Sequence, residues 1–495
     1  LYLSATDLWP RGDESARLER LPDFFKETTA QGIERIRREA FGDVPTVVFV
    51  DAAGRIVAEG TGLEAALIRR NFLFCLNPAC GVAYTKTQRS ERGKLSTLGV
   101  DNRSTATTIL AVRALIELQT DRDLQPEARK LLSFTDNRQD ASLQAGHFND
   151  FAQVMLLRSA LHQAMQAQGA SGLTHGQLSR QVFEALKLPF ADYAADPGVR
   201  GPAQTLTNDA LRQVIDYYLY RDLQHGWRWT LPNLEDCDLL VFDYVGLTGP
   251  DGLLAETEVW EAGLTVRGDG NHEQFAATPP TLQACPSAVK EKLLRTLLDV
   301  LRHGLAVKVD VLDETKQRDW VEKTKPRLRE DTVWYLEDSR ELVKATIAYP
   351  RQGQREDRSG LFISSYGSYG RYLRRSLKSY APPGQPFGRA EVDAVIRFLL
   401  LALKRYGIVE QVRSGELPAA RGRGRRPAPV ALAEPIPGYQ INPDALRWLP
   451  GSGEIRPLDP TRLVEAGEIP PEVNRYFVEC YRHFIQLKSR LEARE

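Results

Sequence analysis

One segment of the sequence joins an apolar run, a polar turn and a long amphipathic pattern. Residues 130–135 read KLLSFT and are followed by Asp136 and Asn137, and apolar side chains then recur at mostly three- and four-residue steps over residues 138–168. The run predicts a short buried strand, and the recurring steps predict a long helix. A strand that turns directly into a helix is typical of α/β domains.

The junction between this strand and this helix is suited to an anionic ligand. Ligands of open α/β sheets bind at the carboxyl ends of the strands. The first turn of a helix adds free N–H groups and the positive end of its dipole, which suit a phosphate. Arg138 and Gln139 would contribute a charged donor and an amide donor. The alternative is an ordinary capped helix, with Asp136 or Asn137 as the N-cap.

Residues 131–151, LLSFTDNRQDASLQAGHFNDF, resemble the fourth helicase motif of very large bacterial superfamily 2 DEAD/DEAH-box helicases, some of which sit in antiphage defence loci. Residues 103–108 and 486–495 also resemble family segments, so the span between would be an insertion in the second RecA-like domain. The resemblance implies ATP and Mg²⁺ as cofactors of the full-length protein. It implies nucleic-acid backbone contacts for Thr135, Asn137, Arg138 and Gln139.

The sequence lacks the nucleotide-binding motifs of such helicases. It has no Gly-x-x-x-x-Gly-Lys-Ser/Thr loop to cradle phosphates and no Asp-Glu-Ala-Asp or Asp-Glu-x-His box to hold magnesium. Leu1 is not a translation start. We therefore expect a fragment of a longer helicase, which does not hydrolyse ATP by itself.

A different order of elements is predicted within residues 346–450. A basic helix over residues 371–380 precedes an apolar-faced helix over 389–406, a strand over 407–412, a loop over 413–437 and a strand over 438–441. Helix, helix, strand, long loop and strand is the order of a winged helix-turn-helix. Such modules bind nucleic acid or serve as structural and protein-docking modules.

Basic side chains gather in two parts of this module, although the whole chain carries 65 basic and 65 acidic residues. Residues 361–380 contain four tyrosines and no acidic residue, a pattern that predicts a platform for single-stranded nucleic acid. The long loop contains RGRGRR, which suits phosphates or an A·T minor groove. We therefore expect a nucleic-acid partner, DNA rather than RNA. The candidate contacts are Arg371, Arg374, Arg375, Lys378, Arg421, Arg423, Arg425 and Arg426.

Cys75 and Cys80 form a Cys-x4-Cys knuckle-like turn, with Pro78 inside it and Gly81 after it. Such a turn could present thiolates to Zn²⁺, but a structural zinc takes four ligands. The sequence offers no second cysteine pair, and the nearest histidine is His147. Two interpretations stay open: a zinc site that uses Cys75 and Cys80, and a pair of unbound thiols.

These patterns predict a mixed, helix-rich α/β chain that holds a partial RecA-like domain with a large helical and winged-helix insertion. The expected regions are a small mixed α/β region with a hairpin (1–72), the cysteine segment (73–100), the start of the RecA-like domain (101–168), a helical insertion (169–345), the winged-helix module (346–450), and a linker and helix (451–495).

The expected function is a part in an ATP-dependent nucleic-acid helicase or translocase, with an accessory DNA-binding module. The resemblance adds other defence or repair proteins as partners. The alternative is a non-enzymatic winged-helix DNA-binding or scaffold protein. No run reaches the ~20 apolar residues of a membrane span, and no signal peptide is visible, so we expect a cytoplasmic protein without a membrane partner.

Overall fold

The computed structural model divides the chain into two units, which are described separately. The first comprises Leu1–Asn102, Tyr366–Tyr372 and Asp459–Ile469, and the second comprises Arg103–Ser365, Leu373–Leu458 and Pro470–Glu495. The structure describes residues 9–12, 14–22, 25–28, 34–70, 72–74, 76, 100–121, 123–125, 128–132, 138–224, 231–267, 273–336, 342–351, 360–384, 387–412, 437–455, 459–461 and 472–486.

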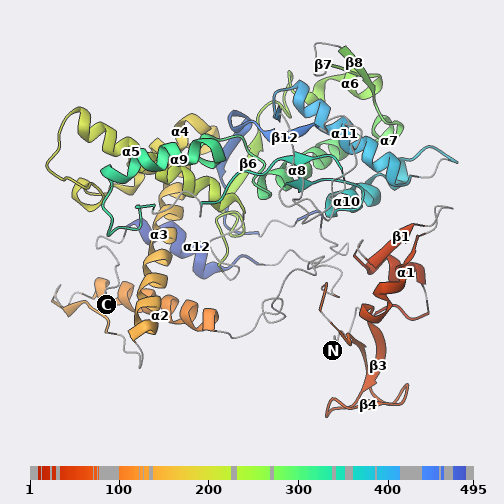
Figure 1. Ribbon diagram of the computed structural model, residues 1–495, viewed down its shortest axis with the longest axis horizontal. Coiled ribbons are helices and arrows are strands. Elements are labelled where there is room, and N and C mark those ends of the chain that lie inside the picture. Colours follow the sequence, from red (N-terminus) through yellow and green to blue (C-terminus); the bar gives the residue numbers. More distant parts are fainter. Residues whose placement is uncertain are drawn as a thin grey trace, which may run out of the picture. The chain divides into compact units, whose positions relative to one another are not determined.

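The first unit contains a three-stranded antiparallel sheet in the order β4-β3-β5, formed by β3 (Thr46–Val50), β4 (Ile56–Val57) and β5 (Leu63–Leu67). The predicted hairpin is confirmed, since the Asp51 carboxylate accepts the N–H groups of Ala53 and Arg55 and so fixes the turn. Helix α1 (Glu14–Arg20) and the β1–β2 hairpin (Lys26–Thr28 and Glu34–Ile36) complete this part (Figure 1).

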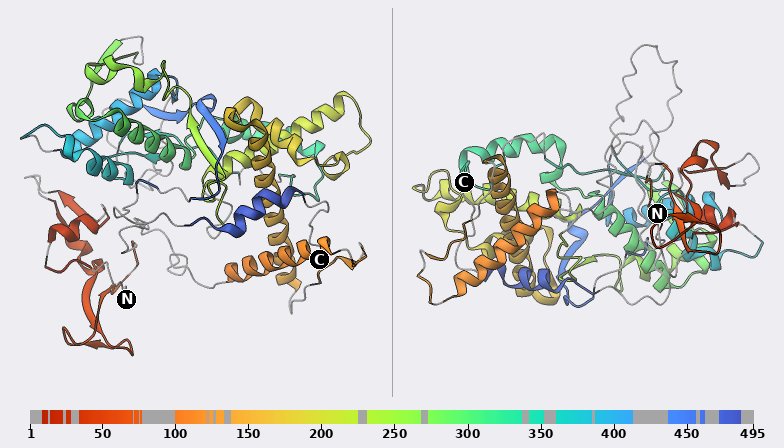
Figure 2. Two further views of the ribbon diagram at one scale, coloured as in Figure 1. Left: turned by 180° about the vertical axis from the view of Figure 1, so that it is seen from behind. Right: turned by 90° about the horizontal axis from the view of Figure 1, so that it is seen from below.

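Helix α3 (Arg138–Gln168) is the longest element of the second unit, and its predicted range is confirmed. It packs against α4 (His175–Leu186), which packs in turn against α5 (Pro202–Arg221). Thr174 starts α4 through a capping box with Gln177. Helix α12 (Arg475–His483) lies across α3, as the views of Figures 1 and 2 both show. The N-terminal half of α3 faces α2 (Val100–Thr120), where Thr108 bonds to His147 at 3.0 Å.

A two-stranded sheet joins segments that are far apart in the sequence. Strand β6 (Leu240–Tyr244) pairs antiparallel with β13 (Leu446–Pro450). The side chain of Trp448 holds this pair in the core, since it is 1% exposed and its ring contacts the rings of Phe242 and Tyr220. Strand β13, which lies within the predicted winged-helix module (346–450), therefore pairs with a strand from the region predicted as the helical insertion (169–345).

The predicted winged-helix region contains α10 (Ser368–Leu377), α11 (Arg389–Arg405), β11 (Val409–Val412) and β12 (Gly438–Ile441). Strands β11 and β12 pair antiparallel, as predicted. They belong to a four-stranded sheet in the order β10-β9-β12-β11, which also contains β9 (Ala348–Tyr349) and β10 (Leu361–Phe362).

The buried stripe of α8 (Ser287–His303) is built from leucines at helical spacing.

The remaining elements of the second unit lie between α5 and β9 in the sequence. A hairpin of β7 (Gly263–Arg267) and β8 (Glu273–Ala277) is flanked by α6 (Thr257–Glu261) and α7 (Pro280–Ala284), and α9 (Glu314–Thr324) follows α8. The mixed, helix-rich α/β class is confirmed. In the part of the chain that the structure describes, no helix is long and apolar enough to cross a membrane.

The prediction of a buried strand over residues 130–135 is wrong for its first half. Residues 130–132 are irregular, and the side chains of Leu131 and Leu132 are 43% and 79% exposed. A short apolar run becomes a buried strand only where neighbouring strands pair with it, and no described strand pairs with these residues. Residues 133–137 lie outside the described part of the chain.

Candidate functional site

Helix α10 carries the basic residues that the sequence singled out. Arg371, Arg374 and Arg375 stand at positions i, i+3 and i+4, which places them on one face of the helix. Lys378 continues the same face in the 3-10 turn that follows, and the residues of Arg375 and Lys378 are exposed. Arg371 is tied to the backbone, because its Nη1 donates to the carbonyl oxygen of Tyr366 at 3.0 Å.

The opposite face of α10 is apolar and buried. Tyr369, Tyr372, Leu373 and Leu377 are each no more than 6% exposed. The two tyrosine rings contact each other with centroids 6.1 Å apart. The helix therefore has one cationic face and one packed face, which fixes the direction in which its charges project.

The predicted stacking role is wrong for Tyr369 and Tyr372, because buried rings offer no face to a base. Burial also raises the pKa of the Tyr369 hydroxyl well above its ordinary value. The sequence could not separate the two roles, because the spacing that interleaves tyrosines with cations also places the tyrosines on the core side of an amphipathic helix. The nucleic-acid contacts expected of α10 are therefore those of its basic side chains.

Several other candidate residues lie outside the described part of the chain. Arg138 and Gln139 begin helix α3, as predicted for the helix boundary, but only their backbone is described. The candidates of which the structure describes nothing are Thr135, Asn137, Arg421, Arg423, Arg425, Arg426, Cys75 and Cys80. Among the described residues, no group of three or more His, Cys, Asp or Glu side chains is placed to hold a metal ion. The zinc site stays a prediction.

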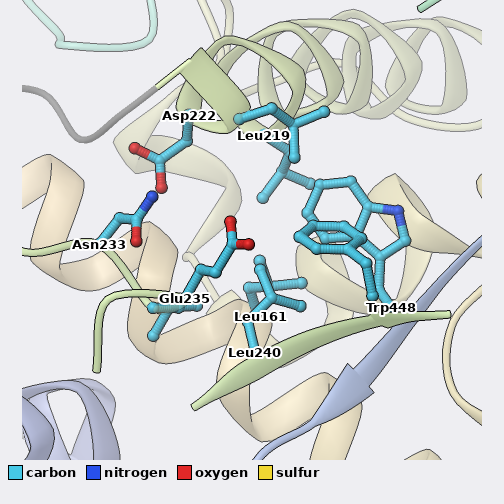
Figure 3. A pocket seen from close by; sticks show the side chains of 10 residues that line it. Leu161, Leu219, Asp222, Asn233, Glu235, Leu240 and Trp448 are labelled. Carbon is cyan, nitrogen blue, oxygen red and sulfur yellow. The ribbon is translucent and has the colours of Figure 1, made fainter. Parts of the chain in front are cut away.

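The second unit contains a small pocket with a cavity volume of about 10 Å³, which is the size of a single water molecule. Its wall combines the apolar side chains of Leu161, Leu240 and Trp448 with the carboxylates of Asp222 and Glu235. Figure 3 shows these two carboxyl groups facing the same space, with the Trp448 ring on its other side. Each carboxylate forms an ion pair with a buried arginine.

Arg158 of α3 holds the first carboxylate. Its Nε and Nη2 donate to the two oxygens of Asp222 at 2.9 and 2.6 Å, and its Nη1 donates to the Tyr481 hydroxyl at 2.7 Å and to the Pro232 carbonyl at 3.1 Å. Burial alone would lower the pKa of Arg158, but Asp222 and Tyr481 outweigh it and raise that pKa above its ordinary value. The guanidinium therefore stays charged although it is 2% exposed.

Arg302 of α8 holds the second carboxylate in the same way. Its Nη1 and Nη2 donate to Glu235 at 2.8 and 2.6 Å, and Nη2 also reaches Asp299. Burial would raise the pKa of Glu235, but the charge of Arg302 and a hydrogen bond with His303 hold it well below its ordinary value. Glu235 therefore stays ionised near neutral pH and has no proton to give as a general acid.

Of each of these two ion pairs, only the arginine could have been recognised from the sequence. Arg302 follows Leu294 and Leu298 on the apolar stripe of α8, and Arg158 follows Phe151 and Met155 on the buried side of α3. A charged residue in such a stripe indicates a buried ion pair. Its partner could not be identified, because the carboxylates come from a segment more than sixty residues away.

Comparison of the chain with protein-family models, with curated proteins and with solved structures gave no match.

Proposed function

We propose that this chain is part of an ATP-dependent nucleic-acid helicase or translocase, in which residues 346–450 form an accessory module that holds the nucleic-acid backbone. The observation that carries the proposal is the cationic face of α10. Three arginines and a lysine project from the side opposite the packed residues, in a stretch of twenty residues (361–380) without an acidic side chain. Such a face binds phosphates and displaces their counterions.

The pairing of the strands supports a winged-helix form for the module. Strand β9 precedes α10 and α11, and the β11–β12 hairpin follows them. The order β9-β12-β11 places the hairpin beside the earlier strand. The hairpin loop carries the four arginines of RGRGRR, which we propose as a second group of phosphate contacts.

The ATP-dependent part of the proposal rests on the resemblance of residues 131–151 to the fourth helicase motif. In that role Thr135, Asn137, Arg138 and Gln139 would bind the backbone while ATP-driven motion of the whole protein moves it. The nucleotide and Mg²⁺ would be held by other segments, because this sequence has neither the phosphate-binding loop nor the acidic box.

Fluorescence anisotropy with labelled single-stranded, duplex and forked DNA, measured from about 50 to 200 mM salt, tests the proposal. We expect binding whose affinity falls steeply as salt rises. Binding to none of the three DNAs at the lowest salt would overturn the proposed function. Equal binding of single-stranded RNA would leave backbone contact intact and remove the preference for DNA.

The same cationic face would serve a non-enzymatic DNA-binding or scaffold protein, the second candidate function. The two are distinguished by reading the coding sequence on either side of this chain. A phosphate-binding loop with an acidic box upstream and an arginine-finger motif downstream would support the helicase. An initiator codon directly before Leu1 and a stop codon after Glu495 would support the scaffold.

A further inference from the structure

The interface between α3 and α12 contains a buried histidine. His162 of α3 is 7% exposed and lies one turn after Arg158, on the side of the helix that α12 covers. Two hydrogen bonds hold α12 and the 3-10 turn that follows it against this side: the one between Arg158 and Tyr481, and one in which the N–H of Ile485, in that turn, donates to the Ser159 hydroxyl at 3.0 Å. His162 therefore lies where α12 is attached to the rest of the second unit.

The hydrogen bonding of His162 suits the neutral imidazole. One side of the ring bonds to the backbone of Leu239, just before β6. The other nitrogen, Nδ1, is buried and has no hydrogen-bond partner among the described residues. A second proton would create a buried N–H group at Nδ1 without an acceptor, which is unfavourable in a protein interior.

The charges that act on His162 also oppose a second proton. Burial lowers the pKa of His162, and the charges of Arg482 and His483, both on α12, lower it further against the hydrogen bond with the Leu239 backbone, which raises it. Glu479 of α12 pairs with both of them, with Arg482 at 3.5 Å and with His483 at 3.3 Å. Asp238, beside Leu239, accepts hydrogen bonds from Ser452 and from the N–H groups of residues 454 and 455. The carboxylates of Glu479 and Asp238 are thus bound to other partners.

We propose that the α3–α12 contact is acid-sensitive and that protonation of His162 detaches α12 from α3. The charged imidazole would meet Arg482 across the interface and would place an unbonded N–H group in the core. Once α12 detaches, water reaches His162 and the charge is solvated. The proposal does not depend on the proposed nucleic-acid function, because it concerns the attachment of one helix within the second unit.

The size of the expected pH effect follows from the linkage between proton binding by His162 and detachment of α12. A solvated imidazole has a pKa of ~6.5, so at pH 5.5 about ten of eleven detached molecules carry the proton. If the attached form stays neutral, the population with α12 detached rises about tenfold between pH 7.5 and 5.5. The stabilisation is complete above the ordinary pKa of histidine and is lost as the pH falls below it.

Hydrogen–deuterium exchange of the intact chain tests the proposal at about pH 7.5 and 5.5, after correction for the intrinsic pH dependence of exchange. We expect the protection of residues 475–486 to fall about tenfold at the lower pH, while that of α8 stays constant. His162→Gln keeps an N–H donor for Leu239 and carries no charge, so its α12 protection should be the same at both pH values.

Two further variants test whether the loss of α12 protection at low pH arises from His162 and the charge that faces it. His483→Gln removes the weaker of the two opposing charges, on a side chain that is 61% exposed, and leaves Arg482 in place, so this variant should keep most of the loss of the wild type. Arg482→Gln should reduce the loss, because the opposing charge is gone; this variant keeps the test valid if His162→Gln does not fold. The proposal is overturned if wild-type α12 keeps its protection at the lower pH, or if both His162→Gln and Arg482→Gln lose as much as the wild type.

Discussion

The hydroxyl of Tyr481 accepts a hydrogen bond from Nη1 of Arg158 at 2.7 Å and donates to the Pro232 carbonyl at 2.6 Å. Both side chains are almost completely buried. One hydroxyl therefore joins α12 to α3 and to the segment before β6, and it satisfies a guanidinium that has no access to water.

Tyr481→Phe should lower the free energy of unfolding by about 2 kcal/mol, because the substitution leaves a buried guanidinium N–H of Arg158 without a partner and removes one of the two hydrogen bonds that the Pro232 carbonyl accepts. Urea unfolding followed by circular dichroism measures the loss. Tyr406→Phe is the matched control, since it removes an exposed hydrogen bond to Glu256 and should change stability by less than about 0.5 kcal/mol. Equal effects of the two substitutions would contradict the role given to Tyr481.

Glu235→Gln should destabilise the second unit by about 3 kcal/mol at pH 7, since it leaves the buried charge of Arg302 without its main partner. The pKa of Glu235 is lowered in the folded chain, so its stabilisation is present above the ordinary pKa of ~4.5 and is lost as the pH falls below that value. The gap between wild type and variant should therefore narrow towards pH 3. Glu410→Gln, which breaks the exposed pair with Lys308, should show neither effect.

Asp216→Asn should stabilise the second unit at neutral pH, whereas Glu235→Gln should destabilise it. The Oδ1 atom of Asp216 is buried without a hydrogen-bond partner among the described residues, and burial raises the pKa of Asp216 to about 7 against the opposing charge of Arg212. The unfolded chain releases this proton near pH 4, so the folded state loses stability as the pH rises from about 4 to 7.

The variant should consequently be more stable than the wild type at pH 7.5, by up to about 4 kcal/mol, and nearly equal to it at pH 4. Thermal unfolding at the two pH values checks this difference. Asp319→Asn, at a side chain that is 70% exposed, is the control and should leave stability unchanged at both. A destabilised Asp216→Asn at pH 7.5 would show that the carboxylate has a partner in solution.

Helices formed by local patterns could be predicted from the sequence. The apolar steps after residue 138 placed α3 correctly, and the apolar face of residues 389–406 placed α11 within one residue. Helical hydrogen bonds and helical faces both depend on residues three or four positions apart, so the pattern contains most of the information.

Contacts between distant segments could not be predicted in this way. Leu131 and Leu132 have the composition of a buried strand, but burial depends on partners that a local pattern does not reveal. The pairing of β6 with β13 and the two buried arginine–carboxylate pairs likewise join segments far apart in the sequence. Of the candidate site, a basic helix was predicted over residues 371–380 and is observed over Ser368–Leu377, whereas the position of its tyrosines depended on which side of the helix is packed.

The salt dependence of DNA binding by two charge-reversed variants tests the central claim most directly. Arg375→Glu/Lys378→Glu alters the exposed end of the α10 face, and Arg397→Glu/Arg405→Glu makes the same change of charge at exposed positions of α11. If α10 contacts phosphates, the first variant should bind single-stranded DNA more weakly, and its slope of log K against log salt should become less negative by about 1.4, or ~0.7 for each lost contact. The second variant should keep the wild-type slope. Equal slopes for the wild type and the α10 variant, or equal losses in both variants, would contradict the account.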